Sequence, residues 1–341
     1  MTVPRIEIIG AGVAGLSCAT LFAKAGCQVQ VKASSDGPSH ECCSWWAGGM
    51  LAPWCELEST EPLIAELGLQ SMSFWQSASS AVHCKGSLVI ANSRDLPDLK
   101  QFASRTKHFA NIDKDQITEL EPDLADRFEQ GLYFDTECHL DPRLALRQLV
   151  EQLQSLDNVT LVFGQTINAR EQDQIDNQRI DWRIDCRGLA ARDSLADLRG
   201  VKGEMLILRL PELQLHRPVR LLHPRYPLYI VPRDDHHFMV GATMIESDDT
   251  RSVSARSAME LLSAAYALHP AFAESAIIEM ACDARPAFTD NLPRLRRRGK
   301  TLYINGLFRH GFLCGPAMAQ RAVDFVLKEQ IDEKVMDENN D

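Results

Sequence analysis

The length and composition of the chain predict a globular protein with a large core, divided into two domains. It has 341 residues, of which 45% are hydrophobic and 24% are charged, a balance typical of ordinary folded proteins. The formal net charge of −11 would repel phosphate backbones, so we expect no nucleic-acid partner.

Membrane association and export are not expected either. No apolar stretch approaches the roughly 20 residues needed to cross a bilayer. The first apolar run, Ile6 to Gly15, contains Glu7 and three glycines, which is unlike the hydrophobic part of a signal peptide. The ten cysteines are scattered, with no CxxC pair and one vicinal pair, Cys42-Cys43. This spacing predicts mostly buried, reduced thiols in the cytoplasm rather than disulfides, and we expect no metal site.

The chain begins with the pattern of a βαβ unit. Arg5 to Ile9 is a short apolar run of strand character, and Leu16 to Ala25 carries apolar residues at helical spacing. Gly26 ends this predicted helix as a left-handed cap. Val29 to Lys32 then alternates as a second strand.

Three glycines lie between the first strand and the helix. Gly10, Gly12 and Gly15 have the GxGxxG spacing of dinucleotide-binding turns. The first allows a tight turn, the second lets the backbone approach a pyrophosphate, and the third allows close packing of helix and strand. Free N–H groups at the helix N-terminus favour the anion. This context predicts dinucleotide binding.

The acidic residue that usually ends the second strand and binds ribose hydroxyls is missing. The strand ends Lys32-Ala33-Ser34-Ser35-Asp36. One interpretation is that Ser34, Ser35 or Asp36 replaces the ribose contact, and this is the one we favour. The others are that Lys32 binds the 2′-phosphate of NADP, or that it is an exposed strand residue without a role.

Further along the chain the pattern changes from alternating helices and strands to β-rich runs. Short runs divided by Pro, Asp and His lie between Glu204 and Met244 and predict an antiparallel sheet. Helices are expected at Glu61–Ser79, Pro142–Leu156, Ser254–Leu268 and Pro316–Glu329. The expected fold class is α/β, a Rossmann-like dinucleotide-binding domain interrupted by an α+β domain with a mainly antiparallel sheet.

The predicted domains are discontinuous. Residues 1–80, 139–200 and 299–331 form the dinucleotide-binding domain, and residues 81–138 and 201–298 form the second domain. Residues 332–341 are an acidic tail that we expect to be disordered. The basic run Arg294, Arg296, Arg297, Arg298 and Lys300 is interpreted as a solvated turn between two strands.

Several segments, in order along nearly the whole chain, carry a family resemblance. The chain resembles the glycine oxidases of the thiazole-synthesis pathway, which belong to the D-amino-acid oxidase superfamily of flavoproteins. The similar segments are Ser44–Pro53, Val201–Met205, Tyr229–Arg233 with Val240–Met244, Arg285-Pro286 with Asp290, and Gly306–Leu313.

This resemblance implies noncovalent FAD, a small amino-acid substrate and molecular oxygen. Arg285 would hold the substrate carboxylate, because its planar fork gives two parallel charge-assisted hydrogen bonds. Tyr229 would share that carboxylate through its hydroxyl. Arg309 would lie near the flavin, and Met50 and Met244 would line the pocket. No general base is required if the amine enters neutral, so His310 and the pair His236-His237 are given no such role.

The residues that the resemblance assigns to FAD share a place in the glycine-rich turn, the segment around Met50 or the closing segment. They are Gly10, Gly12, Val13, Ala14, Gly15, Ala33, Ser34, Cys43, Ser44, Gly48, Gly49, Met50, Ile167, Leu307, Phe308, Arg309, His310, Gly311, Phe312 and Leu313. The expected substrate domain is then the α+β domain, and the expected reaction is oxidative deamination of glycine.

The sequence also departs from the family pattern. Cys42-Cys43 stands where small hydroxyl residues are more usual, and Pro227 stands two residues before Tyr229, where one branch has a histidine. Alternatives therefore remain open. They are oxidation of sarcosine or a small D-amino acid, an electron acceptor other than oxygen, a noncatalytic flavin-binding partner protein, and an NADP-dependent reductase. The resemblance also allows assembly into a homo-oligomer.

Overall fold

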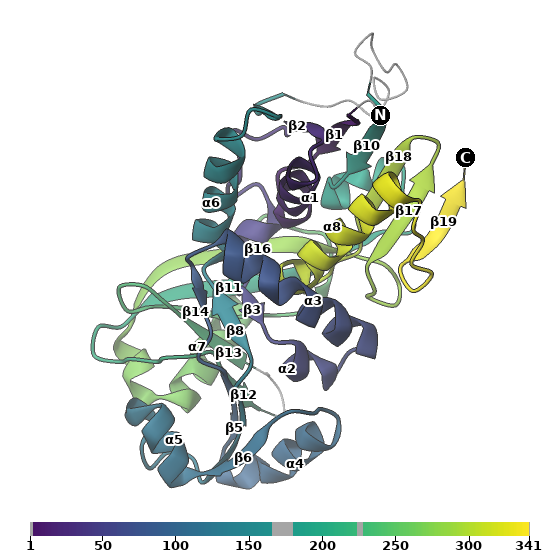
Figure 1. The fold of residues 1–341 in the computed structure, drawn as a ribbon. Coiled ribbons are helices and arrows are strands. Elements are labelled where there is room, and N and C mark those ends of the chain that lie inside the picture. The colour runs from purple at the N-terminus through teal and green to yellow at the C-terminus, as the bar shows by residue number, and fades with distance from the viewer. Residues whose placement is uncertain (1–2, 166–179, 224–227, 341) are drawn as a thin grey trace.

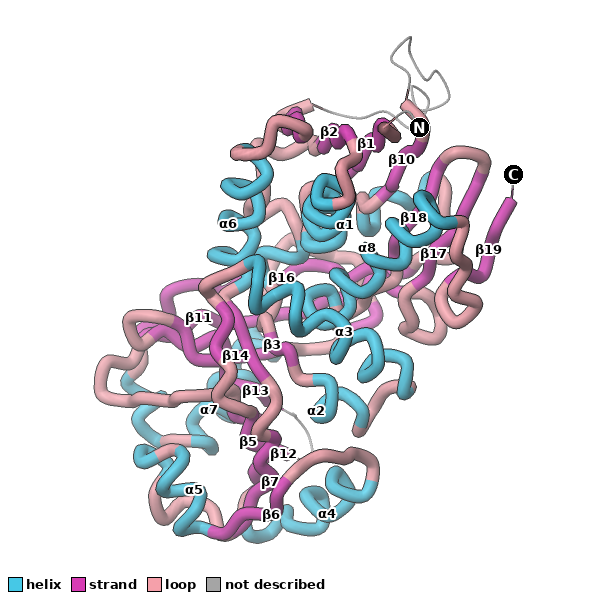
Figure 2. Tube along the Cα trace, viewed as in Figure 1, coloured by secondary structure: helices cyan, strands magenta, loops and turns pink. Residues whose placement is uncertain are grey.

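The protein has two parts that meet along a pair of long strands. The computed structural model describes residues 3–165, 180–223 and 228–340. One part contains both chain ends and a sheet covered by helices, and the other contains a larger, mainly antiparallel sheet (Figure 1). The tube in Figure 2 shows the same division, with helices concentrated around the first sheet and at the outer edges of the second.

The first sheet has seven strands and a parallel centre. Four adjacent pairs, β18–β10, β10–β1, β1–β2 and β2–β9, run parallel, as the βαβ pattern predicts. Helix α8 (Gly311–Lys328) packs against both α1 (Val13–Lys24) and α3 (Pro62–Ala78) on this sheet. The strands, in spatial order, are β19 (Met336–Asn340), β17 (Arg294–Arg298), β18 (Thr301–Asn305), β10 (Trp182–Asp185), β1 (Arg5–Ile9), β2 (Gln28–Lys32) and β9 (Val159–Val162).

The second sheet is built on β11 (Arg199–Arg209) and β16 (Ala276–Ala287), which pair antiparallel along their length. The sheet confirms the mainly antiparallel prediction, with β12 and β5 as a parallel pair. Its other strands are β15 (Ile245–Glu246), β14 (His237–Gly241), β13 (Leu228–Arg233), β12 (Val219–Leu222), β5 (Ser87–Ala91), β7 (Gln130–Phe134) and β6 (Ala110–Asp113). Its helices are α4 (Leu96–Ser104), α5 (Lys114–Leu120) and α7 (Ala255–Leu268).

A small third sheet and one further helix connect the two parts. Strands β3 (Met50–Leu51), β8 (Cys138–Leu140) and β4 (Val82–His83) form this sheet, and α6 (Pro142–Gln154) follows β8. The observed architecture confirms the predicted fold class, whereas the residue boundaries of the two domains remain a prediction. No helix in the described ranges combines the length and the apolar character that crossing a bilayer requires.

The last helix begins earlier than its sequence predicts. Pro316 favours a helix start because it has no N–H to donate, yet α8 begins at Gly311 and contains Pro316. The carbonyl that would have accepted the missing bond belongs to Phe312. The indole Nε1 of Trp75, on α3, donates to this carbonyl at 2.7 Å. A side chain far away in sequence thus compensates for the proline.

The described part of the acidic tail, residues 332–340, is ordered, so the prediction of disorder is wrong there. The prediction of a turn is wrong for the four arginines of the basic run, which lie in β17 beside β19, whereas Lys300 does lie in the turn before β18. Asp337 accepts from Nε of Arg294 at 3.1 Å and from Nε of Arg296 at 2.8 Å. Val335 is buried. Charge complementarity between two segments about 40 residues apart explains both errors.

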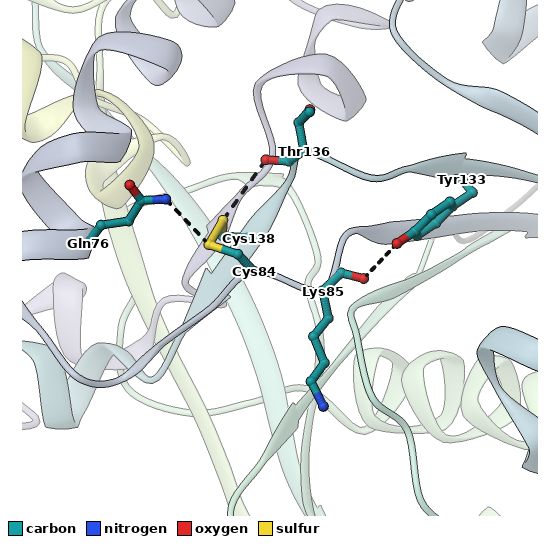
Figure 3. The surroundings of a disulfide bond; sticks show 6 residues. All are labelled: Gln76, Cys84, Lys85, Tyr133, Thr136 and Cys138. Carbon is teal, nitrogen blue, oxygen red and sulfur yellow. Dashed lines mark hydrogen bonds between the residues drawn. A yellow bond between two sulfur atoms is a disulfide. The ribbon is translucent and has the colours of Figure 1, made fainter.

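The prediction that the cysteines form no disulfide is also wrong. Cys84 and Cys138 are bonded although 54 positions separate them (Figure 3). Antiparallel pairing of β4 with β8 sets His83 opposite His139 and so brings the two cysteines together. The remaining eight cysteines are free, and five of them are buried.

Candidate active site

A long cleft of about 500 Å³ lies at the carboxyl ends of β1 and β18 and over the N-terminus of α1. Gly10 has a φ of +106°, and a Cβ there would lie 2.6 Å from the carbonyl oxygen of Cys186. The turn therefore needs glycine. Helix α1 has no side-chain N-cap from Gly12, and the Val13 N–H donates to Oγ of Ser44 at 3.1 Å. This helix end suits an anion such as a pyrophosphate.

Lys32 does not line the long cleft. Its Nζ lies 2.6 Å from Oε1 of Glu7, whose other oxygen accepts from Nε of Arg183 at 2.6 Å. Burial raises the pKa of Glu7, but hydrogen bonds from both cations lower it below its ordinary value overall. Lys32 is thus ion-paired with a buried carboxylate. This gives no support to a contact between Lys32 and a 2′-phosphate.

The wall of the long cleft that follows β2 carries polar side chains. Ser34 and Ser35 line it next to Ala33, as does Glu41 from the following loop. Glu41 is a carboxylate in the cleft that the spacing rule could not find, because it lies nine residues past the end of β2. We infer that the hydroxyls of a ribose would meet Ser34, Ser35 or Glu41 here.

The long cleft continues into an inner pocket of about 100 Å³. The two cavities share the wall residues Val13, Cys43, Ser44, Asp283, Phe308 and Gly311. Helix α8 starts at this junction, so the positive ends of both α1 and α8 face the connected space. An elongated cofactor with an anionic middle and a flat end fits this arrangement.

Arg285 and Tyr229 both line the inner pocket, from β16 and β13. A Cβ at Gly203 would lie 2.1 Å from Nη2 of Arg285, so the absence of a side chain on β11 makes room for the guanidinium. Gly48 does the same for Tyr229, because a Cβ there would lie 2.9 Å from its Cε2. Nη1 of Arg285 donates to the Thr243 carbonyl at 3.1 Å. Within the described ranges Arg285 forms no ion pair.

Arg309 and His310 close the other side of the inner pocket and share one carboxylate. Oε2 of Glu56, on α2 (Pro53–Leu57), lies 2.7 Å from Nη2 of Arg309 and 2.9 Å from Nε2 of His310. Oε1 of Glu56 lies 3.3 Å from Nη2 of Arg220. Burial raises the pKa of Glu56, but Arg309, His310 and Arg220 together bring it well below its ordinary value. Burial lowers the pKa of His310, which favours a neutral imidazole.

An outer cavity of about 830 Å³ adjoins the inner pocket across Arg220, Phe308, Arg309 and His310. Met244 lines this outer cavity with 55% of its surface exposed, and its sulfur lies 3.6 Å from Nη1 of Arg309. These four residues thus stand between the outer cavity and the inner pocket.

Comparison with known proteins identifies the family. The model of the FAD dependent oxidoreductase family matches residues 5–325. The chain belongs to this family. It is 47% identical over 327 residues to the putative thiamine biosynthesis oxidoreductase ThiO of Rhizobium etli, covering 96% of this chain and 97% of the relative. It is 24% identical to a glycine oxidase of Pseudomonas aeruginosa, over 94% of each chain.

A solved structure supports the fold. The crystal structure of glycine oxidase from Geobacillus kaustophilus superimposes with a TM-score of 0.80 at 21% identity, covering 97% of this chain and 96% of that one. The predictions of family, fold class, enzyme and FAD cofactor are confirmed. As an FAD dependent oxidoreductase, the protein has a cleft whose residues fit the cofactor it requires.

The structure brings most predicted site residues of this oxidoreductase together. Those that line the long cleft are Gly10, Gly12, Val13, Ala14, Ala33, Ser34, Cys43, Ser44, Leu307, Phe308 and Gly311. Those that line the inner pocket also include Gly48, Gly49, Met50, Tyr229, Arg285, Arg309, His310, Phe312 and Leu313.

Two predicted site residues lie elsewhere, and one lies outside the described residues. Gly15 is buried in α1, where a Cβ would lie 1.9 Å from the Gly10 carbonyl oxygen, so its place is in packing behind the turn. Met244 lines the outer cavity and not the inner pocket. Ile167, and also Pro227 near Tyr229, lie outside the described residues.

Sequence reasoning missed Glu56, Arg220, Gly203 and Asp283, all of which line the inner pocket. Glu56 was hidden in an acidic stretch, and Arg220 lies in an ordinary β-rich run. Gly203 and Asp283 stand in register on β11 and β16. Only the alternation of Asp283 with Arg285 could have indicated that they share a face.

Proposed function

We propose that this oxidoreductase catalyses the oxidative deamination of glycine in the cytoplasm. Glycine, oxygen and water would give glyoxylate, ammonia and hydrogen peroxide, through an imine that water hydrolyses. The putative thiamine biosynthesis role in the name of the Rhizobium etli relative and the glycine oxidase name of the Pseudomonas aeruginosa relative support this choice. The imine or its products would then supply thiazole synthesis for thiamine.

One observation supports the proposal most strongly. The guanidinium of Arg285 lines a small pocket beside the phenol of Tyr229 and forms no ion pair with a carboxylate of the described residues. A half-buried cation without a directly bonded counter-ion is costly, and a substrate carboxylate would supply that partner.

The side chains would then bind and orient the substrate. Arg285 would hold the carboxylate through two N–H groups, and the Tyr229 hydroxyl would donate to the same group. FAD, when bound, supplies the hydride acceptor for the substrate Cα and passes the electrons to oxygen. Holding the carboxylate fixes which face of Cα meets the cofactor. No described side chain needs to remove a proton if the amine enters neutral.

Arg309 has a separate proposed role. Glu56 and Ser59 hold its Nη2 at 2.7 and 2.8 Å, so the guanidinium is fixed at the boundary between the inner pocket and the outer cavity. Its positive charge would favour electron uptake in the inner pocket. Met50 would line the cofactor side and Met244 the entry side.

The test is a product assay on an amine panel. The purified FAD-containing protein should convert glycine with equal amounts of peroxide, glyoxylate and ammonia. Sarcosine and D-alanine are the competing substrates, and a preference for either would move the substrate assignment to it. A protein that binds FAD but turns over none of the three would be the noncatalytic flavin-binding alternative.

A variant links the activity to the pocket. Arg285→Ala should raise the apparent KM for glycine about a hundredfold, because a charge-assisted pair is lost, and FAD should stay bound. Arg209→Ala is the control, since Arg209 pairs with Asp235 at the exposed end of the second sheet. An unchanged KM in Arg285→Ala would remove the proposed role.

A further inference from the structure

Asp283 is a carboxylate in the cofactor space to which the site described above gives no role. It lies on β16 opposite Gly203 of β11 and two residues before Arg285. Residues two apart on a strand point to the same side of the sheet. Asp283 and Arg285 therefore project toward the same space, next to a strand position that carries no side chain.

The position of Asp283 is the junction of two cavities. It lines both the long cleft and the inner pocket, together with Val13, Cys43 and Ser44. Val13 opens α1, where the pyrophosphate is expected, and Arg285 marks the substrate end. Asp283 thus lies between the part of the space suited to phosphates and the part suited to a flat ring.

The hydrogen-bonding capacity of Asp283 is largely unused. Its Oδ1 accepts from the N–H of Ala284 at 2.7 Å, and no ion pair or other hydrogen bond reaches it from the described residues. Burial raises the pKa of Asp283, and the Ala284 N–H and the Arg285 charge lower it only in part. A ligand that donates hydrogen bonds would satisfy this half-buried acceptor, which otherwise has few partners.

The chemistry of the carboxylate selects one part of FAD. An ionised carboxylate only accepts hydrogen bonds, and it would repel the pyrophosphate. The polyol chain between the pyrophosphate and the ring carries hydroxyl donors, and it is the part of the cofactor that would cross the junction. A hydroxyl bound to a carboxylate makes a charge-assisted bond, about twice as strong as a neutral one.

We propose that Asp283 binds the ribityl hydroxyls of FAD through its side-chain oxygens. The neighbouring thiols of Cys42 and Cys43 are poor substitutes, because burial raises the pKa of both and a neutral thiol is a weak hydrogen-bonding group. Asp283 thus supplies polar contact in a stretch of the cleft wall where the chain has cysteines. The inference concerns cofactor binding alone and does not depend on which amine is oxidised.

The test is a binding cycle that uses flavin fluorescence and no substrate. The full-length protein, stripped of flavin, is reconstituted with FAD or with an FAD analogue whose ribityl hydroxyls are replaced by hydrogen. Wild type, Asp283→Asn and Asp283→Ala are compared. Asp235→Asn is the charge-matched control, because Asp235 lies in an exposed turn with a φ of +54°, which asparagine tolerates.

The expected result is coupling between the carboxylate and the hydroxyls. Loss of the hydroxyls should weaken binding to wild type and to Asp235→Asn at least tenfold more than it weakens binding to Asp283→Ala. Asp283→Asn should fall between them. The proposal is overturned if the ratio of the Kd for the analogue to the Kd for FAD is the same in wild type and in both Asp283 variants. If Asp283→Ala fails to fold, Asp283→Asn against wild type gives the same comparison. A protein that fails to oxidise glycine would still give a clear answer here.

Discussion

Arg285 keeps its place in the inner pocket because the strand opposite it carries no side chain at Gly203. A Cβ there would lie 2.1 Å from Nη2 and 2.2 Å from Cζ of Arg285. The clashing atoms are the end of a flexible side chain, so Gly203→Ala should fold but displace the guanidinium. We expect the KM for glycine to rise tenfold or more with FAD retained, measured by steady-state kinetics.

A second glycine provides the matched control for that variant. Gly315 lies inside α8, and a Cβ there would lie an ordinary 3.7 Å from Cγ2 of Val13, the nearest atom outside the helix. Gly315→Ala should leave the KM unchanged and should not lower stability, because alanine favours the helix. A KM in Gly203→Ala equal to that of Gly315→Ala would show that the space above Gly203 does not determine where Arg285 lies.

Glu137 gives a pH-dependent prediction. It is fully buried, and its Oε1 accepts from the N–H groups of Trp54 and Cys55 at 3.0 and 2.7 Å. Burial raises its pKa from an ordinary 4.5 to about 7. Between these two values the folded protein keeps a proton on Glu137 that the unfolded chain has lost. The resulting contribution to the free energy of unfolding is therefore fully present below the ordinary pKa and is lost as pH rises through about 7.

The measurement is urea unfolding of wild type and Glu137→Gln at about pH 5 and about pH 8. Between these values, wild type should lose about 2–3 kcal/mol relative to Glu137→Gln. Any constant cost of the amide cancels in this difference. Glu129→Gln, at an exposed position, should show no such change. A wild type that gains stability relative to Glu137→Gln as pH rises would contradict the raised pKa.

Among the elements, α8 depends on a contact with another helix. The Trp75 indole occupies the Phe312 carbonyl that Pro316 leaves without its usual partner. Trp75→Phe should cost about 1–3 kcal/mol of unfolding free energy from the unsatisfied carbonyl, in addition to the lost packing. Adding Pro316→Ala returns a backbone N–H and should recover part of the loss, measured by urea unfolding. No recovery would mean that this carbonyl is not what makes Trp75 important.

The elements that the sequence predicted well are those whose signal is local. The bounds expected for the first strand, Arg5 to Ile9, are those of β1, because an apolar run and the glycine turn that follows it determine them. The start of α8, the strand β19 and the Cys84–Cys138 disulfide were missed. Each depends on a partner far away in sequence, and no local pattern carries that information.

The same division applies to the site. Gly10 and Gly12 could be predicted because their backbone chemistry follows from adjacent residues, and Arg285 and Tyr229 because the family resemblance marked them. Glu56 could not, because its importance comes from two arginines and a histidine that lie on other segments. A buried charge network is a tertiary property.

For the molecule as a whole, the C-terminal tail holds the edge of the first sheet. Asp337 pairs with Arg294 and Arg296, and the Leu295 N–H donates to the Val335 carbonyl at 2.8 Å. Asp337→Asn keeps the shape and removes the charge. We expect the free energy of unfolding to fall by about 1 kcal/mol in low salt. The loss should be smaller in high salt, because screening weakens the ion pairs.

Thermal or urea unfolding at two salt concentrations measures this effect. Asp249→Asn is the control, because Asp249 pairs with Arg251, whose side chain is 87% exposed, and such pairs contribute little. A loss of stability in Asp337→Asn that does not respond to salt would show that the tail is held by packing and backbone bonds rather than by charge.

The whole arrangement is tested by a crystal structure of the FAD-containing protein with glycolate, which is glycine with a hydroxyl in place of its amine. The carboxylate of glycolate should contact the Arg285 guanidinium and the Tyr229 hydroxyl, with its Cα directed at the flavin ring in the inner pocket. Glycolate bound in the outer cavity, or a guanidinium of Arg285 turned away from the carboxylate, would contradict this structure-based assignment.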